Sequence, residues 1–322
     1  MAALSEIHAP ELTELRRVRV DDLDAVLNEE ECVWKDRLSW DFRPSADLVR
    51  RFVGVQALSG FALVAGGRVI GYSYFVTEDQ KGLVGDLYIL RDFATAELEY
   101  QLLGAVLDRM MSSPFLHRVE SQLMMLHSPL EADLPHASFA RCYPRNFMVV
   151  DLRASGKLPV GKARQNIVLE PWSERFQEDA ARVIASAYQG HIDSEINDQY
   201  RSVQGARRFL VNIVQYPGCG SFFQPASFVA QQQGSGRTAG ICLSSLVAPE
   251  VGHITQVCVM PGSKGSGIGY ELVRSSLLAL AEHGCHSASL TVTSTNREAV
   301  KLYERMGFVT KRNFSAFVWE GF

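Results

Sequence analysis

The stretch of this sequence with the clearest chemical meaning is residues 257–272, which read VCVMPGSKGSGIGYEL. An apolar segment runs into a loop that contains Gly265, Gly267 and Gly269, and the loop runs into residues with the apolar spacing of an amphipathic helix. Glycines let the backbone approach a ligand closely, and the first amides of a helix have no acceptors within the helix. We therefore expect an anion site here, and a pyrophosphate suits such a site.

The glycines alone do not separate one phosphate-binding motif from another. A Walker loop requires G-x-x-x-x-G-K-[ST], and no Lys-Ser or Lys-Thr pair follows these glycines. A dinucleotide fingerprint requires an acidic residue about 20 residues further on, where this chain has Ser289 in an apolar run. A nucleotide-dependent enzyme therefore stays as an alternative, and it predicts binding of ATP or NAD.

A second motif follows the loop. Residues 287–293 (SASLTVT) predict a strand, and Asn296 precedes a predicted helix over 297–306. The two motifs together resemble the GNAT acetyltransferase superfamily. KGSGIG at 264–269 corresponds to the family's [QR]-x-x-G-x-[GA], and the pattern N-x-x-A-x-x-[LF]-Y-x-x-x-G-F is matched by Asn296, Ala299, Leu302, Tyr303, Gly307 and Phe308. Lys264 departs from the usual Gln or Arg, but a lysine still places positive charge beside a phosphate.

The resemblance implies that the half from Ile167 to Phe322 binds acetyl-CoA and transfers its acetyl group to an amine by direct attack. It implies Tyr303 as the general acid to the leaving thiolate. The implied cofactor-binding residues lie on the strand, in the loop and before the last helix: Val257, Cys258, Val259, Lys264, Gly265, Ser266, Gly267, Ile268, Gly269, Tyr270 and Asn296. A catalytically silent CoA-binding sensor or interaction module is the alternative.

The base that receives the proton of the amine is harder to identify. His253 lies at the head of the predicted strand, where the family often has an acidic residue, and an imidazole titrates in a useful range. Gln256 lies nearby but cannot accept the proton. An acidic group in the segment expected to cover the acceptor would attract a cationic amine, and its members are Asp193, Glu195 and Asp198.

Two other groups of reactive side chains are interpreted as structural. Cys258 has no evident basic partner in the strand, so we expect a raised pKa and disfavour this thiol as a nucleophile. The run His283-Gly-Cys285-His286 supplies too few well-directed ligands for a tetrahedral metal site. We therefore predict no metal.

The strands and helices that must hold these motifs are repeated in the N-terminal half. Each half has a predicted hairpin, then a strand, then an apolar-periodic helix: 60–75, 82–90 and 96–111 in the first half, and 227–245, 250–260 and 269–282 in the second. Residues 91–98 (RDFATAEL), where the repeat places a second phosphate loop, contain no glycine. We therefore interpret the first half as a degenerate copy without the cofactor.

The expected fold class is α/β (α+β), with two tandem GNAT-like domains, each a mixed, mostly antiparallel sheet flanked by helices. The stretch 151–165 (DLRASGKLPVGKARQ) is polar, with no sustained apolar period. We expect a degenerate domain over 1–152, a linker over 153–166 and a catalytic domain over 167–322.

Composition limits the remaining possibilities. The chain has 322 residues, 47% of them hydrophobic and 21% charged, with a formal net charge of -4, so it has no basic surplus for nucleic acid. Its six cysteines are scattered, which favours a reducing cytoplasm. We predict no signal peptide and no membrane span, because the N-terminus is polar and no run of 18 apolar residues occurs. The acceptor is a small-molecule or peptide amine of open identity, and monomer and homodimer both remain open.

Overall fold

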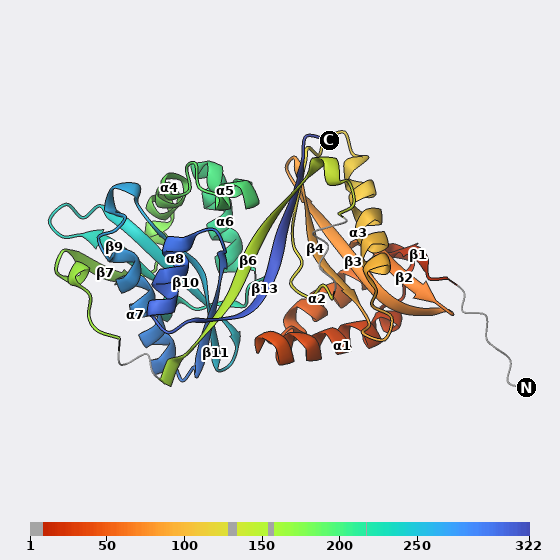
Figure 1. The fold of residues 1–322 in the computed structure, drawn as a ribbon, viewed down its shortest axis with the longest axis horizontal. Helices are drawn as coiled ribbons and strands as arrows, with labels where there is room; N and C mark the ends of the chain where they lie inside the picture. The colour runs from red at the N-terminus through yellow and green to blue at the C-terminus, as the bar shows by residue number, and fades with distance from the viewer. Residues whose placement is uncertain (1–8, 128–133, 154–157, 217) are drawn as a thin grey trace, which may run out of the picture. The chain divides into compact units, whose positions relative to one another are not determined.

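The computed structural model describes residues 9–127, 134–153, 158–216 and 218–322 (Figure 1). The chain folds into two compact units. Unit 1 comprises Met1–Tyr143 with Phe314–Phe322, and unit 2 comprises Pro144–Asn313. No helix in the described ranges is both long enough and apolar enough to cross a membrane.

Unit 2 is built on a mixed sheet in which the strands lie in the order β6-β12-β11-β10-β9-β7. The strands are β6 (Ala140–Asp151), β7 (Ile167–Pro171), β9 (Phe228–Gln232), β10 (Thr238–Ala248), β11 (Val251–Val259) and β12 (Ser287–Thr293), and a short β8 (Ser221–Phe222) pairs with β10. Among the described pairs of this unit, β11 and β12 are parallel and the others antiparallel. A parallel pair needs a crossover connection, which α7 (Ile268–His283) provides.

Helices cover both faces of this sheet. One apolar cluster lies under α7 and α8 (Arg297–Arg305), and a second lies under α4 (Gln177–Ala187) and α6 (Val203–Gln215). The remaining short helices are α5 (Asp193–Ile196) and the 3-10 turns η4 (Lys162–Gln165), η5 (Glu174–Phe176), η6 (Asp198–Arg201), η7 (Gln224–Ala226) and η8 (Pro261–Ser263). The sheet of unit 2 is therefore the middle of three layers.

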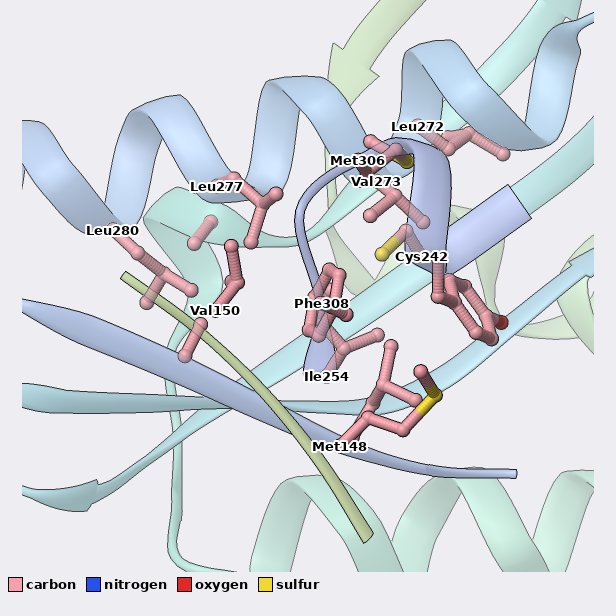
Figure 2. Packing of buried hydrophobic residues seen from close by; sticks show 14 of the residues in the cluster. Met148, Val150, Cys242, Ile254, Leu272, Val273, Leu277, Leu280, Met306 and Phe308 are labelled. Carbon is pink, nitrogen blue, oxygen red and sulfur yellow. The ribbon is translucent and has the colours of Figure 1, made fainter. Parts of the chain in front are cut away.

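The apolar stripe of α7 explains why this segment forms a helix against the sheet. Leu272, Leu277 and Leu280 are fully buried, and Figure 2 shows them directed toward the strands, with Phe308 among them. Each such side chain contributes about 1.5–3 kcal/mol by leaving water. A Cβ atom at Gly252 would come within 2.5 Å of Leu280, so the glycine allows the helix to approach β11 closely.

Unit 1 has its own sheet in the order β1-β2-β3-β4-β5-β13. Its strands are β1 (Glu11–Glu14), β2 (Ser59–Ala65), β3 (Arg68–Glu78), β4 (Lys81–Ile89), β5 (Arg118–Gln122) and the end of β13 (Val309–Glu320). Its helices are α1 (Val20–Leu38), α2 (Arg43–Gly54) and α3 (Ala96–Met111), with 3-10 turns η1 (Leu15–Arg17) and η2 (Ala137–Phe139). As in unit 2, one pair, β4 and β5, is parallel and the other pairs described are antiparallel.

The two units repeat one plan down to the register of their strands. In unit 1, β4 pairs with β5 over Lys81–Val84, and a bulge against β3 follows at Gly85. In unit 2, β11 pairs with β12 over Val251–Ile254, and a bulge against β10 follows at Thr255. In both units the parallel pairing ends at the residue before the bulge. The predicted fold class of two tandem domains, each with a mixed sheet and flanking helices, is confirmed.

The division between the units differs from the predicted one. The expected boundaries at residues 152 and 167 fall inside unit 2, because β6 pairs with β12 over Arg145–Asp151. The last residues of the chain belong to unit 1, because β13 pairs with β5 over Ala316–Glu320. Of the predicted linker 153–166, residues 154–157 lie outside the described part of the chain, and η4 occupies Lys162–Gln165.

Candidate active site

The glycine-rich loop leads directly into α7, and the first amides of this helix have no acceptors within the described chain. Gly267 is the N-cap residue with a φ of 88°, a conformation that favours glycine, and no side chain caps the helix. The backbone N–H groups of Gly265, Gly267 and 268–270 donate no hydrogen bond to a described residue. Together with the positive end of the helix dipole, these donors can bind an anion.

Beside this loop, β11 separates from β12. The parallel pairing ends at Ile254, although β12 continues to Thr293 and β11 to Val259. The N–H of Met260 donates to the carbonyl of Ala239 on β10, at 2.8 Å. Because successive residues of a strand point their backbone groups to opposite sides, those of Val257 and Val259 face away from β10, toward the open side. Beyond Ile254, β11 is therefore separated from β12.

Tyr303 lies at the other side of this opening, on α8. It is seven residues after Asn296, so both lie on one face of the helix. Asn296 is the N-cap, since its Oδ1 accepts from the N–H of Ala299 at 3.3 Å. Tyr303 is 7% exposed, and burial raises the pKa of its hydroxyl above the ordinary value. The hydroxyl makes no hydrogen bond to a described residue, so it is free to donate to a ligand.

Two stacked tyrosines cover the same stretch of β11. The rings of Tyr188 and Tyr200 lie 4.4 Å apart, and Gln256 Nε2 donates to the Tyr188 hydroxyl at 3.0 Å. The Tyr188 hydroxyl also lies 3.5 Å from the carbonyl oxygen of Val257. Burial raises the pKa of both tyrosines, so both hydroxyls stay protonated at neutral pH.

A histidine and an aspartate meet at the carboxyl end of β12. The hydroxyl of Thr293, the last residue of the strand, donates to Asp193 Oδ1. His191 Nδ1 lies 3.7 Å from Asp193 Oδ2, and His191 Nε2 lies 3.4 Å from Asn296 Nδ2. The side chains of His191 and Asp193 are 24% and 15% exposed. The structure therefore brings the predicted Asp193 to the same place as Asn296 and adds His191 to it.

The comparison with protein families decides what this arrangement is. Residues 194–308 match the model of the Acetyltransferase (GNAT) family. Unit 2 therefore carries a GNAT family match. The matched stretch includes β11, the loop, α7, β12 and α8, which are the elements that carry the predicted motifs.

Known proteins similar to the chain agree with this family. A mycothiol acetyltransferase of Acidimicrobium ferrooxidans is 36% identical over 103 residues, which are 31% of this chain and 33% of that protein. The match thus spans about a third of the relative's length. A GCN5-related N-acetyltransferase of Sphaerobacter thermophilus shares the fold over 96% of this chain and 95% of its own, with a TM-score of 0.66 and 18% identity.

A second solved structure extends the likeness to the two-domain plan. A tandem GNAT protein from the clavulanic acid biosynthesis pathway covers 97% of this chain and 98% of its own length, with a TM-score of 0.59 and 14% identity. At these identities the likeness shows the fold alone. The chain therefore has the tandem GNAT fold.

His253 does not fit the role of base that the sequence suggested. It lies 3% exposed in unit 2, its Nδ1 is 2.9 Å from Ser289 Oγ, and its ring stacks on Phe147. Burial lowers its pKa to about 3, because the charged imidazolium loses its solvation. An imidazole with that pKa takes a proton from an ammonium poorly, so the geometry favours a packing role for His253.

Four other residues predicted for the site, Cys258, Lys264, Glu195 and Asp198, differ in their exposure to solvent. Burial raises the pKa of Cys258 to about 12, as expected for a thiol that does not act as a nucleophile. Lys264, the first residue of the loop motif, is exposed. Glu195 pairs with Arg201 at 3.2 Å and is 44% exposed, so it faces solvent more than Asp193 does. Asp198 begins η6 and is partly buried.

Sequence reasoning did not identify three residues that the fold brings to the site: His191, Tyr188 and Tyr200. They lie between the end of α4 and the end of η6, where the spacing of polar residues resembles that of a solvated loop. The one available signal was the run HIDSEIND at 191–198, in which a histidine precedes the acidic group.

Proposed function

We propose that this chain is an acetyl-CoA-dependent N-acetyltransferase that acts on an amine. The observation that carries the proposal is the juxtaposition of an uncapped α7 N-terminus, an unpaired edge of β11 and the free hydroxyl of Tyr303. The family of residues 194–308 and the acetyltransferase names of the relatives support it.

The residues present fit acetyl-CoA. The amides of Gly265, Gly267 and 268–270 would hold its pyrophosphate, and the open backbone groups of Val257 and Val259 would hold its pantetheine arm. A Cβ atom at residue 269 would lie 3.6 Å from Val259 and 3.9 Å from Leu302, so a side chain there would narrow the space between β11 and α8. When bound, acetyl-CoA supplies an activated thioester.

Proton removal from the acceptor falls to the pair at the end of β12. An aliphatic amine is mostly protonated at neutral pH and cannot attack until it loses a proton. We propose that Asp193 attracts the ammonium group and that His191 accepts its proton. The backbone N–H of Asp193 donates to Nδ1 of His191 at 3.2 Å, so Nδ1 carries the electron pair that takes the proton. The amide nitrogen of Asn296 lies 3.4 Å from Nε2.

Two further groups lower the barrier: a backbone N–H that faces the developing negative charge, and a hydroxyl that protonates the leaving thiolate. A backbone N–H on the open edge of β11 faces the negative charge that develops on the thioester oxygen during attack. Tyr303 gives a proton to the departing sulfur, because its raised pKa keeps the hydroxyl protonated at neutral pH. The reaction needs no covalent enzyme intermediate, which agrees with the raised pKa of Cys258.

For unit 1 we propose a copy that has lost the cofactor. Its α3 occupies the place of α7, but the Thr95 hydroxyl accepts from the N–H of Leu98 at 3.2 Å and so caps the helix. No left-handed glycine precedes α3 as Gly267 precedes α7. Within the described residues of unit 1, no helix between β5 and β6 corresponds to α8, which carries Tyr303.

A screen of amines tests the proposed function. Acetyl-CoA is mixed with the protein and each amine, and the released thiol of CoA is measured. With an accepted amine, Tyr303→Phe should lower kcat about 100-fold, because a general acid is worth about 10²–10⁴ in rate, and leave the KM for acetyl-CoA within about twofold. Tyr216→Phe is the control, since Tyr216 is 63% exposed on the surface.

Two results would contradict the proposal. If acetyl-CoA binds but no amine in the panel releases CoA, the chain is a CoA-binding module without catalysis. If Tyr303→Phe turns over an amine as fast as the wild type, Tyr303 is not the acid. Stronger binding of ATP or NAD than of acetyl-CoA would overturn the assignment of the glycine loop.

A further inference from the structure

An arginine on the acceptor side of unit 2 has an incomplete set of partners. Arg145 lies on β6, opposite Thr293 of β12 in the strand register. One terminal nitrogen donates to Thr291 Oγ1 at 3.3 Å. Its Nε is buried and has no hydrogen-bond partner among the residues that the structure describes. No carboxylate of the described residues lies within ion-pair distance of its guanidinium.

Leaving Arg145 in this state has a cost. A buried donor without a partner costs about 1–3 kcal/mol, and more when the group is charged. The planar guanidinium offers parallel N–H groups that match a carboxylate, so a carboxylate is the ligand that would satisfy it best. The unsatisfied Nε therefore indicates a place for an anionic group of a ligand.

The carboxylate of Asp193 lies against the same face of β12 as Arg145. Thr291, which contacts Arg145, and Thr293, which contacts Asp193, are two residues apart, so their side chains point to one face about 7 Å from each other. Tyr200 feels both charged groups: beside the main effect of burial, Asp193 raises the pKa of its hydroxyl and Arg145 lowers it. A cation site and an anion site thus flank one stretch of the acceptor face.

We propose that the acceptor is a zwitterion with a short spacer, such as an α-amino acid, whose carboxylate binds Arg145 and whose ammonium group binds Asp193. The proposal rests on the proposed acetyltransferase function. The threonines that contact the two anchors are about 7 Å apart, and two hydrogen bonds of about 2.8 Å with a short spacer between them cover a distance of that order. Binding at Asp193 puts the amine beside His191, which takes its proton.

Matched pairs of acceptors test this inference. The L-α-amino acids and their α-carboxamides are compared as acceptors by release of CoA. The carboxamides are the less basic amines, so amine reactivity alone would favour them. We expect the wild type to prefer the acids. Arg145→Gln should lower that preference about 10- to 100-fold, the range for a charge-assisted hydrogen bond, and leave the KM for acetyl-CoA unchanged.

Further variants keep the test independent of folding. Arg145→Lys retains the charge without the planar fork, and we expect an intermediate preference. Arg182→Gln, on the exposed part of α4, is the control. A cooperative thermal transition at or above the wild-type temperature shows that Arg145→Gln folds. If the wild type acetylates carboxamides as well as acids, or if Arg145→Gln keeps the preference, the inference is wrong although the acetyltransferase function stands. If no amine is acetylated, the proposed function itself fails.

Discussion

Two carboxyl groups, those of Glu30 and Asp86, are buried close together in unit 1. Glu30 is fully buried and accepts hydrogen bonds from Trp34 Nε1 at 3.1 Å and from the Tyr72 hydroxyl at 2.7 Å. Asp86 Oδ1 accepts from the N–H of Leu87 at 2.8 Å. Burial raises the pKa of Asp86 to about 6 and that of Glu30 well above its ordinary value. The folded state therefore retains protons that the unfolded chain would release.

This pair makes the stability of unit 1 depend on pH. Because the folded pKa of Asp86 is raised, its contribution is fully present below about pH 4 and is lost as the pH rises to about 6. Asp86→Asn keeps the acceptor for Leu87 and carries no charge. We expect it to raise the free energy of unfolding at pH 7 by up to about 3 kcal/mol and to change it little at pH 4.

Urea unfolding between pH 4 and 7 measures this effect. Tryptophan fluorescence reports mainly on unit 1, which holds three of the four tryptophans, Trp34, Trp40 and Trp319. Asp92→Asn, on the exposed surface, is the matched control. Equal stabilisation by Asp86→Asn at both pH values would show that folding does not raise the pKa of Asp86.

The site residues differ in how far the sequence could predict them. Tyr303 and Asn296 belong to one local motif with fixed spacing, so their common face of α8 follows from the sequence. The sequence suggested His253 as the base and did not point to His191, because the burial of His253 depends on packing against Phe147 and Ser289. Arg145 reaches the site only through the pairing of β6 with β12, which no local pattern encodes.

At the scale of elements, the start of α7 depends on the left-handed conformation of Gly267. Gly267→Ala strains the backbone by about 1–2 kcal/mol and moves the loop amides away from a bound anion. We expect the variant to bind acetyl-CoA about 10-fold or more weakly in a thermal-shift or calorimetric titration.

A matched glycine separates local strain from the loss of the anion site. Gly234, between β9 and β10, has a φ of 89° and no heavy atom near its missing Cβ. Gly234→Ala should lower the stability by a similar amount without weakening acetyl-CoA binding. If both variants lose acetyl-CoA affinity equally, the loop is not the anion site.

The elements themselves followed closely from apolar spacing. The helix predicted over 269–282 is observed over Ile268–His283, and the strand predicted over 287–293 is observed at the same residues. The bulge at Thr255 could not be predicted, because it arises from pairing with β10. It matters for the site, because the parallel pairing of β11 with β12 ends where the bulge begins.

At the scale of the whole molecule, the duplication was readable from the order of the elements, but the division into units was not. The C-terminal strand β13 leaves unit 2 and pairs with β5 of unit 1, which is nearly 200 residues earlier in the chain. Sequence reasoning assigns a segment to the domain of its neighbours, so a strand that returns to the first unit is missed.

The central claim is that one chain binds one acetyl-CoA, in unit 2. Calorimetric titration of acetyl-CoA into the full chain tests it most directly. We predict a stoichiometry of one per chain, with an affinity that Gly267→Ala weakens and Gly234→Ala does not, because α7 is uncapped whereas Thr95 caps α3. Two equivalents of bound acetyl-CoA, no binding, or one equivalent that Gly267→Ala leaves unaffected would contradict the claim.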